Sequence, residues 1–74
     1  MTRDQMIDLL VARLLREQGR SKHHWRKAIG VIRLYDRETH PHCNWTVTPT
    51  GSVRDVAIIE GLLDDMRFAH PLLS

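Results

Sequence analysis

The sequence predicts a small α+β domain with the order helix, strand, strand, helix. Residues 3–18 and 52–68 place apolar side chains three and four positions apart, which is the spacing of one face of a helix. Between them, residues 29–35 (IGVIRLY) and 44–48 (NWTVT) are rich in the β-branched and aromatic residues typical of strands. We therefore expect a two-stranded antiparallel sheet packed on two amphipathic helices. A chain of 74 residues has room for one domain, residues 1–74.

The first helix carries signals at both ends. Thr2 and Gln5 have the spacing of a capping box, and Asp4 lies in the first turn, where the helix dipole favours negative charge. Gly19 fits the left-handed residue that ends many helices. The expected buried face consists of Met6, Ile7, Leu10, Val11, Leu14 and Leu15. Leu9 lies outside this face, which suggests a second buried contact.

The second helix is bounded as clearly as the first. Ser52 is the expected N-cap, after a turn at residues 50–51, and Pro71 stops the helix because proline cannot continue one. The expected buried face consists of Val56, Ile59, Leu62, Leu63 and Met66. Two long amphipathic helices in so short a chain must share one core.

Residues 22–35 have two interpretations. They can hold the strand at 29–35, or a helix that begins at Ser21 and continues into this run. In that helix one side is formed by Trp25, Ala28, Ile29 and Ile32. We favour the strand, because Gly30 disfavours a helix interior and a Val-Ile pair follows it.

The strand at residues 44–48 alternates Trp45 and Val47 with polar neighbours, so we expect one buried face with Trp45 in the core. Two strands alone are marginally stable and leave both sheet edges open. A chain of this length also buries only about 60% of its unfolded surface. We therefore expect a homodimer, or a protein partner, to complete the sheet or the core.

The segment THPHCNW holds two histidines and the only cysteine within four positions. Zinc needs three or four converging ligands, but in an extended segment His40 and His42 point to one side and Cys43 to the other. A Cys43–His pair for nucleophilic catalysis meets the same difficulty, because adjacent side chains point apart. We therefore predict no metal, no catalytic residue and no cofactor. His40 and His42 can still form a recognition surface with Asn44 and Trp45, although we favour a loop in which Asn44 bonds the preceding turn.

Charge is distributed unevenly along the chain. Residues 1–37 hold nine Lys/Arg against four Asp/Glu, a net +5, and residues 38–74 hold two against five, a net −3. The densest basic segment contains Arg13, Arg16, Arg20, Lys22, Arg26 and Lys27. Such a segment can contact phosphates, so weak nucleic-acid binding is the alternative function. No helix-turn-helix, zinc-finger or RNP-like sequence supports base recognition.

The leading hypothesis is a small non-enzymatic interaction module that forms a homodimer in the cytoplasm. A single cysteine cannot form an intrachain disulfide, which suggests a reducing compartment. The first residues do not have the pattern of a secretory signal, and no apolar stretch approaches the roughly 20 residues that cross a bilayer. We therefore expect no membrane association.

Overall fold

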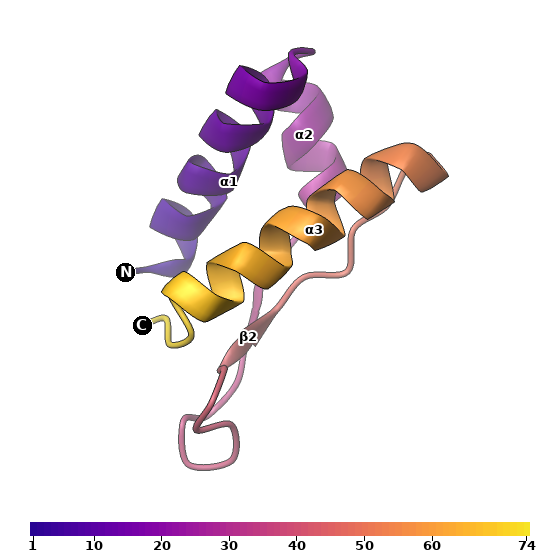
Figure 1. The fold of residues 1–74 in the computed structure, drawn as a ribbon. Helices are drawn as coiled ribbons and strands as arrows, with labels where there is room; N and C mark the ends of the chain where they lie inside the picture. The colour runs from indigo at the N-terminus through magenta and orange to yellow at the C-terminus, as the bar shows by residue number, and fades with distance from the viewer.

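Three helices and a two-stranded antiparallel sheet make up the computed structural model, which describes residues 1–74 (Figure 1). The elements follow in the order α1 (Arg3–Gln18), α2 (Lys22–Ile29), β1 (Arg33–Leu34), β2 (Trp45–Thr46) and α3 (Val53–Ala69). Helices α1 and α2 form a hairpin, and the strands form an arm that extends away from the α1–α2 turn. The α+β class and the order helix, strand, strand, helix are confirmed, with α2 as an additional helix before the sheet. None of the helices is long and apolar enough to cross a membrane.

Both long helices begin and end close to their predicted positions. The Thr2 hydroxyl accepts a hydrogen bond from the Gln5 backbone N–H, and the Gln5 side chain accepts one from Thr2, so the capping box is confirmed. Gly19 ends α1 with φ +76°, a conformation that glycine adopts without steric cost. Ser52 caps α3 by accepting from the backbone N–H of Asp55, and the helix ends before Pro71.

The prediction of a strand over residues 29–35 is wrong in its first part. Ser21 is the N-cap of α2, whose side-chain oxygen accepts from the His24 backbone N–H, and the helix continues to Ile29. Gly30 is the C-cap, with φ +71°, rather than the middle of a strand. The N-cap and the one-sided apolar spacing after it outweigh the β-branched residues of the run, and the strand is confined to Arg33 and Leu34.

The sheet is short, and one further backbone hydrogen bond continues the pairing of its two strands. Arg33 pairs with Thr46 and Leu34 with Trp45, and the Tyr35 N–H donates to the Asn44 carbonyl at 2.7 Å. Side chains directly opposite each other share a face, so Leu34 lies on the same side as Trp45. Both residues of β1 remain exposed.

One apolar core joins all the elements except β1. Its buried members are Met6, Leu10, Val11, Leu14, Trp25, Ala28, Ile29, Ile32, Trp45, Val47, Ile59, Leu62, Leu63, Met66 and Leu73. The predicted burial of Trp45 is confirmed, and Leu9 packs partly against the core, as its position outside the main face suggested. The apolar side of the alternative helix is buried too, and it consists of Trp25, Ala28, Ile29 and Ile32.

The residues after α3 return to the start of β2 and to the N-terminus. Asn44 exchanges two buried hydrogen bonds with the backbone of Leu73, both of 2.7 Å. The Ser74 N–H donates to the Met1 carbonyl at 2.9 Å, so the two ends of the chain lie side by side. The C-terminal segment therefore closes the core at the end opposite the α1–α2 turn.

Candidate interaction surfaces

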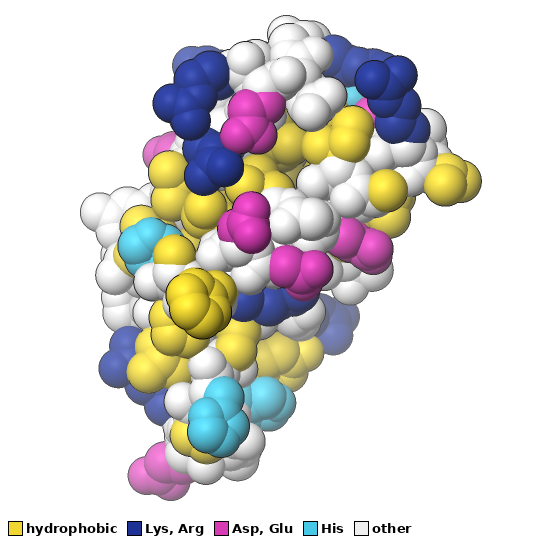
Figure 2. All heavy atoms as spheres, viewed as in Figure 1, with side chains coloured by type: hydrophobic (Ala, Val, Ile, Leu, Met, Phe, Trp, Pro, Cys, Tyr) yellow, Lys and Arg dark blue, Asp and Glu magenta, His cyan; other side chains and the backbone are white.

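The loop between the strands is held by its own hydrogen bonds. The Asp36 carbonyl accepts from the backbone N–H groups of Thr39 and His40, and the ring of His40 stacks on Tyr35 with centroids 4.4 Å apart. His42 is exposed in the same loop. Figure 2 shows histidine side chains gathered at this tip of the molecule. No three His, Cys, Asp or Glu side chains of the chain converge as metal ligands would.

The other residues of this segment turn toward the core. Asn44 and Trp45 are buried, so they take no part in a surface with His40 and His42. Asn44 bonds Leu73 through its side chain rather than the preceding turn, contrary to expectation. The indole N–H of Trp45 donates to the His70 carbonyl at 2.8 Å.

Cys43, the third expected metal candidate, is half-buried. It packs against the core, and its thiol donates to the Trp45 carbonyl at 3.4 Å. Its thiol is thus directed at the backbone and not at the ring of His40 or His42. The structure separates the three residues that the sequence brings close together.

Half of the basic segment is neutralised within the chain. Three of its arginines form ion pairs: Arg13 with Glu17 at 3.1 Å, Arg20 with Asp55 at 3.9 Å, and Arg26 with Asp8 at 3.2 Å. Arg16, Lys22 and Lys27 form no ion pair. The segment that the alternative hypothesis assigns to nucleic acid is therefore a surface of mixed charge.

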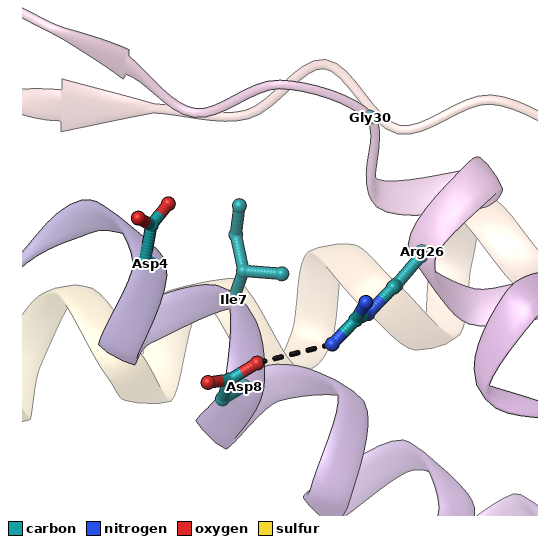
Figure 3. Close-up of a pocket in the computed structure, with 5 residues that line it drawn as sticks. All are labelled: Asp4, Ile7, Asp8, Arg26 and Gly30. Atoms are coloured by element: carbon teal, nitrogen blue, oxygen red, sulfur yellow. Dashed lines mark hydrogen bonds and ion pairs between the residues drawn. The ribbon is translucent and has the colours of Figure 1, made fainter.

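An open groove runs along α1 and α2, and Figure 3 shows one end of it. This end is lined by Asp4, Ile7, Asp8, Arg26 and Gly30. The neighbouring hollow shares Asp8 and Arg26 and is further lined by Val11, Ala12, Leu15, Arg16 and Lys22. Arg26 reaches from α2 toward Asp8 of α1, and their ion pair crosses the groove where the two hollows meet. The pair joins the two helices and divides the groove into two short halves.

A histidine–aspartate pair links α2 to the start of α3. The side chain of Asp55 is only 5% exposed, and its Oδ2 lies 2.9 Å from His24 Nε2, which donates to this carboxylate. The Arg20 guanidinium lies against the same oxygen. The Ser21 and Ser52 hydroxyls accept backbone N–H groups at the two helix starts. The pair holds the imidazole of α2 against the start of α3, and the sequence offered no signal for it.

The outer face of α3 carries the most exposed apolar side chains of the chain. Phe68 is 93% exposed and Val53 is 89% exposed. Between them the face holds the small residues Ala57 and Gly61, with charged residues beside them: Arg54, Glu60, Asp64 and Asp65. Figure 2 shows acidic side chains over the middle of α3 and hydrophobic ones toward its ends. The helical period places Phe68 opposite the buried face, a signal that the sequence analysis left unused.

No protein-family model matches the chain, no curated protein matches its sequence, and no solved structure matches its fold. A function for the chain is therefore inferred from the surfaces described above.

Proposed function

We propose that the chain is a small non-enzymatic interaction module that forms a homodimer through the outer face of α3. The observation that carries the proposal is the exposure of Phe68 and Val53, 93% and 89%, on one helix face. Single exposed apolar residues are ordinary, but a phenylalanine that points fully into water loses the favourable burial of its ring. Covering both ends of the face with a partner recovers that burial, at about 25 cal/mol per Å² of apolar surface.

The size of the domain supports self-association. The strands of the sheet have only two residues each, and both residues of β1 are exposed. Small domains of this kind often gain stability from a partner chain, since their own core is small. Helix α3 has seventeen residues, long enough to present about four turns to a partner.

Nucleic-acid binding through Arg13–Lys27 has less support. Three of its six basic side chains already face carboxylates, which lowers the charge available for phosphates. The cytoplasm is the compartment that the proposal assumes, because a single cysteine cannot form an intrachain disulfide.

Sedimentation velocity tests the proposal. We expect the wild-type chain to sediment at micromolar concentration with twice its mass of 8.6 kDa. Phe68→Ser should raise the dissociation constant at least about tenfold, as for an aromatic side chain that an interface buries. Because Phe68 is exposed in the single chain, the variant should keep its fold, which circular dichroism checks.

Val31→Ser is the matched control. Val31 is 74% exposed but lies between α2 and β1 and is not part of α3, so the change should leave the dimer intact. A wild-type chain that sediments only at 8.6 kDa would contradict the proposal. Equal weakening by both variants would show that general surface hydrophobicity, and not the α3 face, drives association.

A further inference from the structure

The outer side of β1 is an unpaired sheet edge. β1 pairs only with β2, and Asn44, just before β2, is held by the C-terminal segment, since its N–H donates to the Pro71 carbonyl at 3.0 Å. No segment of the chain bonds the other side of β1. A hollow lined by Gly30 and by Ile7 of α1 lies where the chain leaves α2 toward β1 (Figure 3). The helix therefore leaves space at the start of this edge.

The register of the sheet identifies the free backbone groups of the edge. The Tyr35 N–H donates to the Asn44 carbonyl, and Arg33 is paired with Thr46 two positions further along. In an antiparallel pair, successive residues direct their N–H and C=O groups to opposite sides of the strand. Leu34 therefore directs both groups outward, where no group of the chain bonds them. An extended segment alongside β1 would bond both.

Exposed apolar side chains gather at the same edge. Six large apolar side chains of the chain are exposed, and three of them, Val31, Leu34 and Tyr35, lie within five consecutive residues. The two-residue period of a strand places Arg33 and Tyr35 on the face opposite Leu34. An added strand covers such side chains while it makes main-chain hydrogen bonds, and these two contributions supply its affinity and its specificity.

The charge of the edge selects an acidic partner. Arg33 is exposed and forms no ion pair within the chain, and its neighbour on β2 is the neutral Thr46. Residues 31–35 hold no Asp or Glu. A carboxylate opposite Arg33 on an added strand would form the cross-strand charge pair that the fold lacks. The same segment of a second copy would bring another uncompensated arginine instead, and charged residues at a sheet edge oppose such self-pairing.

We propose that the outer edge of β1 binds an extended acidic segment of a partner protein, which adds a third strand to the sheet. The added strand bonds the N–H and C=O of Leu34 and places a carboxylate opposite Arg33. An apolar side chain two residues from that carboxylate covers Tyr35 or Val31. The inference goes beyond the homodimer through α3, because none of these residues belongs to α3.

Fluorescence anisotropy with synthetic peptides tests the charge of the partner. The probe is a fluorescein-labelled peptide in which valine alternates with glutamate, and the matched control peptide has lysine in place of glutamate. We expect the wild-type chain to bind the glutamate peptide at least about fivefold more tightly than the lysine peptide, as for a cross-strand charge pair. Arg33→Glu should reverse this preference. Because Arg33 is exposed, the variant should keep its fold.

Leu34→Pro tests the backbone contact. Proline has no N–H, and at this position it removes a donor that no bond within the chain uses. Leu34→Ala is the matched control, because it removes the same side chain and keeps the N–H. We expect Leu34→Pro to lose most of the affinity for the glutamate peptide that Leu34→Ala retains. Circular dichroism should show the same helix content in both variants.

The other outcomes separate the possible occupants of the edge. Equal affinity for the two peptides, or no binding of either, would overturn the inference, and equal affinity of the two Leu34 variants would place the peptide elsewhere. If Leu34→Pro, but not Phe68→Ser, halved the sedimenting mass, the edge would bind a second copy and the acidic partner would be wrong. Phe68→Ser should bind the glutamate peptide as the wild type does, so a monomeric chain would contradict the homodimer and leave this inference standing.

Discussion

The two tryptophans anchor opposite ends of the core in the same way but by contacts of different range. Both rings are buried, and each indole N–H donates to a backbone carbonyl at 2.8 Å. The acceptor of Trp25 is Gly19, six residues away, in the turn that joins α1 to α2. The acceptor of Trp45 is His70, twenty-five residues away, beyond the end of α3. One end of the core is assembled locally, and the other depends on the return of the C-terminal segment.

The links around the two rings differ in charge as well. Next to Trp25, the ring of His24 bonds the buried carboxylate of Asp55. Next to Trp45, the neutral amide of Asn44 bonds both backbone groups of Leu73. A charged link is favourable only if its charges stay paired, whereas an amide link is favourable only if both of its bonds are made. The comparison therefore predicts different sensitivities at the two ends.

The largest effect is expected from Trp45→Ala. The change removes a buried aromatic ring and leaves the His70 carbonyl without its donor, so we expect a loss of about 3–5 kcal/mol in the free energy of unfolding. The core of a domain this small rarely supplies more than about 3–5 kcal/mol, so much of this variant should be unfolded. Urea denaturation followed by circular dichroism measures the loss. Tyr35→Ala, at a half-exposed aromatic position, is the control, and a loss for Trp45→Ala no larger than the control's would show that the ring does not anchor this end.

The sequence predicted the burial of Trp45, whereas it predicted the burial of Trp25 only in the alternative helix interpretation. The alternation around Trp45 predicted a buried strand residue, because strand periodicity is local. Trp25 lies in a helix that was only the less favoured interpretation of residues 22–35. The strand was favoured because residues 29–35 are rich in β-branched residues and because Gly30 disfavours a helix interior. In the structure Gly30 is the residue after the helix, and the same signal marks the end of α2.

The contacts that link distant segments had no local signal. Asn44 and Leu73 are twenty-nine residues apart, and His24 and Asp55 are thirty-one apart. No periodicity relates such positions, so the sequence could predict that Asn44 needs partners but not which ones. The outer face of α3 is different. Its apolar ends follow from the helical period alone, and only their exposure had to come from the structure.

An intermediate effect is expected at the two links. Asn44→Ala leaves the buried N–H of Leu73 unpaired and its carbonyl with only the 3.4 Å bond from Arg37, so we expect a loss of about 2–4 kcal/mol in the free energy of unfolding. Asp55→Asn keeps the shape of the side chain and one acceptor for His24, so we expect about 1–2 kcal/mol. Urea denaturation of both variants measures the difference. The reverse order would mean that the charged link, and not the C-terminal return, holds the core together.

The smallest effect is expected from His42→Ala. His42 lies in the loop between the strands, which neither tryptophan anchors. His42 is exposed and forms no hydrogen bond or ion pair through its ring, while the backbone bonds of Asp36 hold the loop. The change should therefore cost under about 1 kcal/mol in unfolding free energy, as for most surface positions. His40→Ala should cost slightly more, because it removes the stacking on Tyr35. If His42→Ala instead unfolded the protein or released a bound metal, the loop would be the functional site, since no contact within the fold accounts for such a loss.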